Sequence, residues 1–313
     1  MPVPAPGRVT VVVNPVARGS RAAVETVRQA CAATGRGDPV VLPTTVEEPG
    51  GPQAVEAVRR GTSRIVVVGG DGTVRHVAGA LADEGSAGPG RPTGLGVVPA
   101  GTANLFARGA ALPLRDLRSA AGLAVSGPAR PTDLGRALLR TADGRTLVEP
   151  FLVVAGVGHD AATLAAVRPD AKHRLRWLAY FVPGLGRLGH PGHALTLELD
   201  GHDVDAGELW SLLAVNAARL PAGARVVPGA ELDDGRLHVV LVTPRHVGDW
   251  ARIAATGLRR VPAADHPALR YRSGRTLLVG SPEPVLAQVD GDVVPDIVGG
   301  ELAVLPSALR VAR

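Results

Sequence analysis

Five consecutive residues of this sequence, Gly69-Gly70-Asp71-Gly72-Thr73, combine an accessible backbone with a carboxylate and a hydroxyl. Glycine permits close approach of the backbone to a ligand, and amides at the start of a helix carry partial positive charge, which suits an anionic phosphate. Asp71 would repel a bare phosphate, but it would attract one that carries a divalent cation. The stretch therefore predicts a nucleotide bound with Mg²⁺, and an ordinary Asp-Gly turn is the alternative.

A second candidate loop begins about thirty residues later and reads Pro99-Ala100-Gly101-Thr102-Ala103-Asn104. Gly101 and Thr102 would place another backbone turn and a hydroxyl beside the first loop, although a helix cap would explain the same residues. Two further Asp-Gly pairs occur at Asp233-Asp234-Gly235 and Asp290-Gly291-Asp292. At both of these, a hairpin turn between strands is the alternative to a functional role.

Strand and helix patterns alternate around the two glycine loops. Strands are expected over residues 8–14, 40–42, 64–68 and 94–98, and helices over 21–34, 52–60 and 74–81. This alternation predicts a doubly wound parallel sheet, in which ligands lie outside the carboxyl ends of the strands. Asn14 and Thr44 follow the first two strands, so we expect both residues beside the glycine loops.

After Gly127 the pattern changes to short β-rich segments with polar turns. These segments cover residues 136–140, 146–154, 194–199, 209–215, 237–242, 276–279 and 285–289. They predict an antiparallel β-sandwich as a second domain. The expected division is therefore an α/β domain over residues 1–127 and a β domain over residues 128–300.

Composition narrows the classes of function. The 313 residues contain no apolar run near the roughly 20 that a membrane span needs, and the N-terminus lacks an apolar signal core. We therefore expect a cytoplasmic protein without a transmembrane segment. A single cysteine, Cys31, excludes an internal disulfide. The net charge of +5 favours anionic partners, but no nucleic-acid-binding module accompanies it.

Lysine usage excludes the commonest phosphotransferases. Lys172 is the only lysine. Its neighbours match neither the Gly-Lys-Ser/Thr of a Walker A loop nor the strand that carries the lysine of a protein kinase. The histidines show no zinc spacing, and no Gly-x-Ser-x-Gly motif of serine hydrolases is present. Residues 172–181 place basic residues beside aromatic ones, which suits contact with an anionic membrane surface, although an ordinary helix is the alternative.

The paired glycine loops, with Asn14-Pro15 and Gly19 upstream, resemble the diacylglycerol kinase catalytic family, which includes bacterial lipid kinases and sphingosine kinases. The resemblance continues through Thr132-Asp133-Leu134-Gly135, the segment 155–160 and the two later Asp-Gly turns. It implies an α/β nucleotide-binding domain joined to an antiparallel β-sandwich that receives the lipid. It also implies ATP and Mg²⁺ as cofactors, and return of the last strand, residues 301–313, to the first domain.

The same resemblance implies roles for individual residues. Those expected to hold the nucleotide are Asn14, Thr44, Gly69, Gly70, Asp71, Gly72, Thr73, Gly101, Thr102 and Asn104. Asp71 would also help to organise the catalytic Mg²⁺, and Asp290 would be the general base. Asp234, with the backbone carbonyls of Glu231 and Arg236, would hold a structural Mg²⁺. The family usually has glutamate where this chain has Asp292 and often aspartate where it has Leu105, so a direct role for Asp292 is left open.

The sequence thus predicts a lipid kinase that transfers the γ-phosphate of ATP to a lipid hydroxyl, with diacylglycerol or a related lipid as acceptor. Its lipid substrate would be met at the membrane surface by peripheral association. One alternative is an NAD kinase, although the second motif of that family is absent. Another is a catalytically inactive protein that binds nucleotide or lipid and regulates a partner. The identity of the lipid and the oligomeric state, a homodimer included, stay open.

Overall fold

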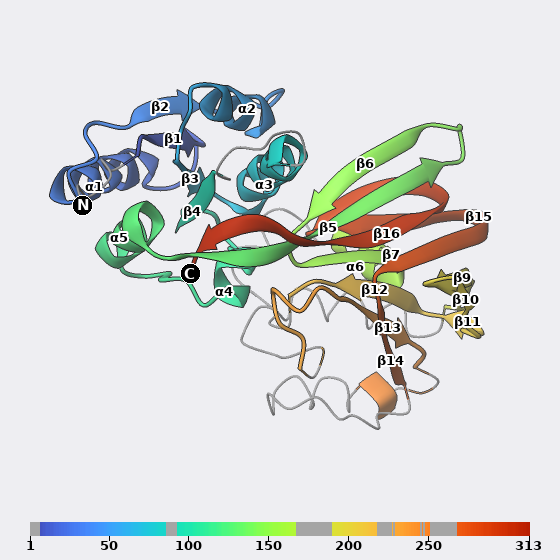
Figure 1. The fold of residues 1–313 in the computed structure, drawn as a ribbon. Coiled ribbons are helices and arrows are strands. Elements are labelled where there is room, and N and C mark those ends of the chain that lie inside the picture. Colours follow the sequence, from blue (N-terminus) through green and yellow to red (C-terminus); the bar gives the residue numbers. More distant parts are fainter. Residues whose placement is uncertain are drawn as a thin grey trace. The chain divides into compact units, whose positions relative to one another are not determined.

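The computed structural model describes residues 7–85, 93–166, 190–217, 227, 229–244, 246, 248–250 and 268–313. The chain divides into two compact units (Figure 1). The first contains Met1–Leu134 and Ser307–Arg313, and the second contains Gly135–Pro306. The basic and aromatic segment 172–181, which was expected to suit a membrane surface, lies outside the described residues. None of the described helices is long and apolar enough to cross a bilayer.

The first unit is built on a parallel sheet. Its strands are β1 (Val9–Val13), β2 (Val40–Pro43), β3 (Arg64–Gly69) and β4 (Gly94–Pro99), in the order β4-β3-β1-β2. The end of the last strand, β16 (Asp292–Ala312), joins this sheet beside β4, where Val311 pairs in parallel with Leu95. All six residues of β3 are buried, which explains the run of β-branched residues before the first glycine loop.

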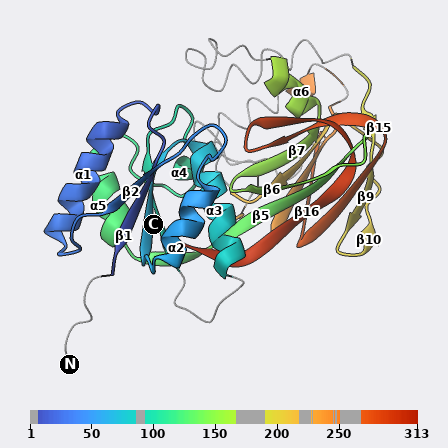
Figure 2. The same cartoon turned by 90° about the horizontal axis from the view of Figure 1, so that it is seen from above.

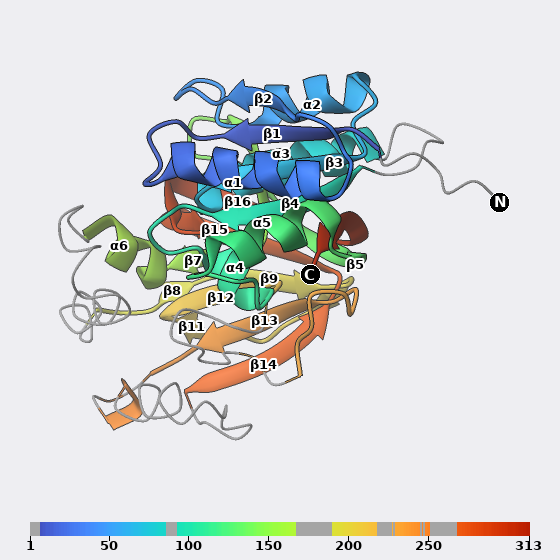
Figure 3. The same cartoon turned by 90° about the vertical axis from the view of Figure 1, so that its left-hand side faces the viewer.

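Helices cover both faces of this parallel sheet. They are α1 (Ser20–Ala33), α2 (Gly51–Arg59), α3 (Asp71–Gly85), α4 (Leu105–Gly109) and α5 (Leu117–Ser126). Helices α1 and α5 pack together over one face, and α2 and α3 cover the other (Figures 2 and 3). Val27, Val66 and Ala121 share the core beneath α1 and α5. The connections leave the loops after each strand at one edge of the sheet.

The second unit is mainly antiparallel. Its elements are β5 (Ala129–Thr141), β6 (Thr146–Phe151), β7 (Val154–Gly158), α6 (His159–Ala166), β8 (His193–Ala194), β9 (Thr196–Leu199), β10 (His202–Asp203), β11 (Glu208–Leu209), β12 (Ser211–Val215), β13 (Leu237–Val242), β14 (Leu269–Gly274), β15 (Thr276–Val289) and β16. Strands follow the order β14-β13-β12-β7-β15-β16, with β5 and β6 beyond β16. Strands β5 and β16 begin in one unit and end in the other.

Strand β15 holds the core of the second unit together. Its first residues pair with β9 and its last residues pair with β7, while β16 runs antiparallel beside it. Register shifts lie between Gly280 and Ala287, so the two strands expected over 276–279 and 285–289 form one irregular strand. The strand expected over 146–154 is instead interrupted at Leu152 and Val153, whose N–H groups donate to a side chain rather than to a neighbouring strand.

Candidate functional site

The two glycine loops of the first unit are in direct backbone contact. The amide of Ala100 donates to the carbonyl of Gly69 at 2.9 Å, immediately after the paired strands β3 and β4 end. A Cβ atom on Gly101 would lie 2.5 Å from the Cα atom of Gly70, and one on Gly70 would lie 3.2 Å from the Cα atom of Gly101. Side chains at this crossing would force the loops apart, so the two glycines are required for the observed approach.

Asp71 joins the first glycine loop to the helix that follows the second. Its carboxylate Oδ1 accepts the backbone N–H of Phe106 at 3.1 Å, in the first turn of α4. Burial raises the pKa of Asp71, while backbone hydrogen bonds from Leu105, Phe106 and Asn104 oppose that rise. The carboxylate therefore supplies the acceptor that helix amides need at their N-terminus.

Asn104 closes the second glycine loop on itself. Its side-chain Oδ1 accepts the N–H of Gly101 at 3.0 Å, and its Nδ2 donates to the Gly101 carbonyl at 2.8 Å. The residue has φ 48° and ψ 53°, a left-handed conformation that asparagine adopts more readily than most residues. Thr102 of this loop is exposed, and Thr73 in the first turn of α3 is buried.

Asn14 and Thr44 follow the other two strands of the parallel sheet at the same edge. The amide of Asn14 donates to the Val68 carbonyl at 2.9 Å, and the amide of Thr44 donates to the Val13 carbonyl at 2.8 Å. The Asn14 side chain accepts the N–H of Val16 at 3.1 Å. Within the first unit, the residues expected to hold the nucleotide all lie at the carboxyl ends of β1 to β4. They belong to the end of β3, to the first turn of α3 and to the loops that follow the strands.

The glycine loops fit a cation that arrives with a nucleotide. Over the described part of the chain, no three His, Cys, Asp or Glu side chains gather as a metal site of their own. Mg²⁺ in phosphotransferases is held by one or two carboxylates together with the substrate phosphates and water. Asp71, a partly buried carboxylate at the start of α3 and beside glycines with little side-chain bulk, suits that arrangement.

The Asp234 carboxylate closes a turn just before β13. The backbone N–H groups of Glu231 and Arg236, whose carbonyls were expected to face a metal, donate to this carboxylate at 3.1 and 2.9 Å. His238 Nε2 lies 2.8 Å from the same carboxylate. Aspartate commonly closes a turn on its own backbone in this way, helped here by Gly235 at φ 68°. The structural Mg²⁺ expected at Asp234 and at the carbonyls of Glu231 and Arg236 stays a prediction.

Asp290 lies in the two-residue turn that joins β15 to β16. Val289 pairs with Asp292 across this turn, and both turn residues have positive φ, 47° at Asp290 and 97° at Gly291. Asp-Gly is a favoured sequence for such hairpins. The hairpin interpretation of this segment is therefore correct for the backbone, and Asp292 is the exposed first residue of β16.

The Asp290 side chain has a second set of partners. Its carboxylate accepts three consecutive backbone N–H groups, from Leu152 at 2.7 Å and from Val153 and Val154 at 2.9 Å each. These donors leave the strand ladder, which explains the break between β6 and β7. Three amide donors fix the position of the carboxylate within the second unit. The expected role of Asp290 as the general base stays a prediction.

Sequence reasoning missed several polar residues around these turns. Gln288, Asp160 and Ser211 form a hydrogen-bonded group next to the Asp290 turn. Gly156, a glycine in the interior of β7, was the available signal, because such a glycine often marks a close approach. In the first unit, buried Asp133 accepts the N–H of Ser307 at 2.7 Å and so secures the returning end of β16.

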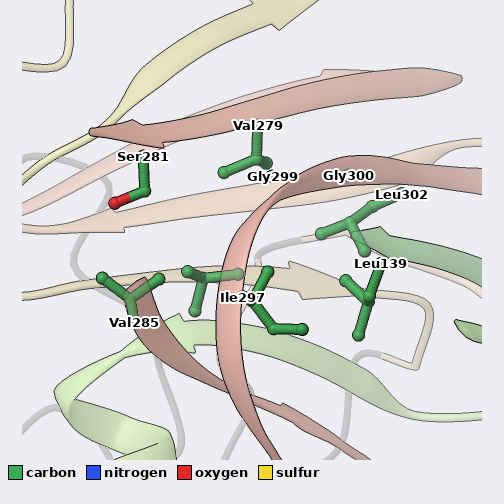
Figure 4. Close-up of a pocket in the computed structure, with 9 residues that line it drawn as sticks. Leu139, Val279, Ser281, Val285, Ile297, Gly299, Gly300 and Leu302 are labelled. Atoms are coloured by element: carbon green, nitrogen blue, oxygen red, sulfur yellow. The ribbon is translucent and has the colours of Figure 1, made fainter. Parts of the chain in front are cut away.

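A small apolar cavity lies inside the second unit. Residues from β5, β7, β15 and β16 line it, among them Leu139, Val285, Ile297 and Leu302 (Figure 4). Its volume of about 10 Å³ is close to that of one water-sized sphere. An acyl chain would therefore require these strands to separate before it could enter.

The doubly wound unit with its two crossed glycine loops, together with the antiparallel unit, defines a fold shared by diacylglycerol kinases and NAD kinases. A diacylglycerol kinase structure from Bacillus anthracis matches with a TM-score of 0.71 and 20% identity, over 98% of this chain and 96% of that one. Yeast NADH kinase matches with a TM-score of 0.51 and 13% identity, over 98% of this chain and 83% of that one. The expected fold class is confirmed.

Sequence relationships assign the family. The model of the diacylglycerol kinase catalytic domain matches residues 8–137, and that of the YegS C-terminal NAD kinase beta sandwich-like domain matches residues 152–313. The chain therefore belongs to the diacylglycerol kinase family of lipid kinases. The "probable lipid kinase YegS-like" protein of Xanthomonas campestris is 34% identical over 76% of this chain and 74% of its own length. The diacylglycerol kinase of Bacillus subtilis is 29% identical over the same shares.

Proposed function

We propose that this protein transfers the γ-phosphate of ATP to the hydroxyl of diacylglycerol or a related lipid. The observation that carries the proposal is the backbone contact between Gly70 and Gly101, which joins two loops of low bulk at the carboxyl edge of a parallel sheet. Family membership supports the kinase activity and the lipid class of the acceptor. The loops from Gly69 to Thr73 and from Gly101 to Asn104 would surround the triphosphate.

Phosphoryl transfer depends mainly on positioning and on neutralising charge, and Mg²⁺ bound to ATP supplies much of that neutralisation. Asp71 would hold the cation from the side of α3. Because its carboxylate also accepts amides of α4, the nucleotide, the cation and the second loop would be fixed together. No part of this assignment uses a metal at Asp234.

Asp290 would accept the proton of the lipid hydroxyl. The three amides that this carboxylate accepts would hold it in place, so that it keeps the hydroxyl in line with the phosphate. Asp292 is exposed at the start of β16, and the proposal gives it no part in proton transfer.

The test compares phosphorylation of a lipid panel by the wild-type protein and by Asp290→Asn. Asparagine accepts the left-handed backbone at φ 47°, whereas alanine would both strain the turn and leave three amides without their acceptor. We expect wild type to phosphorylate at least one lipid, and Asp290→Asn to lose at least about 100-fold in kcat while it binds ATP normally. Equal turnover by both proteins would contradict the role of Asp290, and ATP binding without any phosphorylated lipid would favour an inactive binding protein.

A further inference from the structure

A carboxylate outside the expected site lies next to the Asp290 turn. Asp160 is in the first turn of α6, directly after β7. Its Oδ1 accepts the hydroxyl of Ser211 at 3.0 Å, and the same hydroxyl oxygen accepts the backbone N–H of Asp160 at 2.8 Å. This reciprocal pair holds the Asp160 side chain in one orientation, with Oδ2 directed toward β15.

Gln288 connects Asp160 to the turn. Its Nε2 donates to Asp160 Oδ2 at 3.3 Å, and its Oε1 accepts the backbone N–H of Gly291 at 2.9 Å. Gln288 is only 3% exposed, so water does not replace either partner easily. One buried amide therefore spans from α6 to the residue that follows Asp290.

The neighbouring strand is shaped to admit this contact. Gly156 of β7 pairs directly with Gln288 of β15. A Cβ atom on Gly156 would lie 2.0 Å from Asp160 Oδ2 and 2.9 Å from Gln288 Nε2. No larger residue fits there while the contact between Asp160 and Gln288 persists. The absence of a side chain at Gly156 therefore makes room for the contact between Asp160 and Gln288.

We propose that Gln288 is a positioning residue for the Asp290 turn, and that Asp160 determines which way the Gln288 amide faces. This inference rests on the proposed role of Asp290 as the group that meets the lipid hydroxyl. The carboxylate of Asp160 only accepts hydrogen bonds, so it selects the NH₂ end of the Gln288 amide. The oxygen end is then directed at Gly291 N–H. A reversed amide would oppose oxygen to carboxylate and N–H to N–H.

An exchange of the two side-chain types tests this orientation. In Asp160→Asn, the new NH₂ group attracts the oxygen of Gln288, and Gly291 loses its acceptor. In Gln288→Glu, two carboxylates face each other. In the double variant Asp160→Asn with Gln288→Glu, the new amide at position 160 donates to one oxygen of the new carboxylate at position 288. The other oxygen of that carboxylate accepts Gly291 N–H. The contacts of the wild type are then restored with the charge moved from position 160 to position 288.

We expect each single variant to lower kcat for lipid phosphorylation at least about tenfold, because small displacements of a positioned group reduce turnover strongly. The KM for ATP should stay within about twofold, since the glycine loops belong to the other unit. The double variant should recover to within about threefold of wild-type kcat. Gln29→Glu, an exposed charge change on α1, is the matched control and should leave kcat unchanged.

Two outcomes would overturn the inference. One is wild-type kcat in both single variants, and the other is a double variant no better than the worse single one. Circular dichroism and melting temperatures show whether each variant is folded. A purely structural role would lower stability in the single variants and would not restore kcat in the double variant. The Asp290→Asn assay separates this inference from the proposed function. If Asp290→Asn is inactive but Asp160→Asn and Gln288→Glu both have wild-type kcat, only the positioning inference fails.

Discussion

Replacement of Gly101 by alanine should separate the two glycine loops. The added Cβ atom would lie 2.5 Å from the Cα atom of Gly70, whereas ordinary contacts begin near 3.4 Å, so the loops must move apart by about 0.9 Å. The obstacle is backbone, which cannot rotate away as a side chain would. The same Cβ would also lie 2.9 Å from Asn104 Oδ1, which closes the second loop.

The magnitude follows from the size of that displacement. Overpacking of a close contact typically costs about 1 to 3 kcal/mol of unfolding free energy. A misplacement near 1 Å of a substrate-holding group lowers turnover by about 100-fold. Gly70→Ala needs only about 0.2 Å of movement, because its Cβ would lie 3.2 Å from Gly101 Cα. Its effect on both quantities should therefore be clearly smaller.

The assay measures kcat/KM for ATP, ATP affinity by calorimetry, and unfolding in urea. Gly122→Ala is the matched control, because this helical glycine of α5 has open space around its Cβ position and alanine favours helix by about 1 kcal/mol. We expect the order of activity Gly122→Ala, then Gly70→Ala, then Gly101→Ala. Equal ATP affinity in Gly101→Ala and the control would refute the idea that this crossing shapes the nucleotide site.

Two further predictions concern carboxylates. Asp71→Ala should lower the free energy of unfolding by about 1 to 2 kcal/mol, because the first-turn amides of α4 lose their acceptor; an unchanged urea midpoint would contradict this. Burial raises the pKa of Asp160 from 3.8 to about 6, so the folded state binds this proton more tightly, and stability should fall as pH rises from about 4 to 6 and then level off. The unfolding free energy of Asp160→Asn minus that of wild type should therefore increase by up to about 3 kcal/mol between pH 4 and pH 7. A difference independent of pH would show that burial does not control this carboxylate.

The sequence was sufficient for the features set by local chemistry. β-branched runs predicted the buried strands β1 and β3, and the Asp-Gly pair predicted the hairpin at Asp290. Contacts between residues far apart in the chain could not be predicted from the sequence. The three amides that bind Asp290 lie about 137 residues before it, and nothing local to Leu152 indicates that its N–H leaves the ladder.

Polar side chains in strands were the hardest to interpret. Gln288 has the pattern of an ordinary strand residue, and its side-chain amide donates to a partner in α6 that is 128 positions away. Asp234 illustrates the opposite difficulty. The resemblance implied a metal ligand there, and the structure shows a turn that the side chain closes with two donors within three residues.

The most direct measurement of the central claim follows the fate of each ATP phosphate. The wild-type protein is incubated with diacylglycerol in mixed micelles and with ATP labelled in the γ or, separately, the α position, and the extracted lipids are identified by mass. We predict a phosphorylated lipid that carries label only from γ-labelled ATP, and much less of it with Gly101→Ala. Bound ATP with no labelled lipid, in this mixture and in extracted membrane lipids, would contradict the claim.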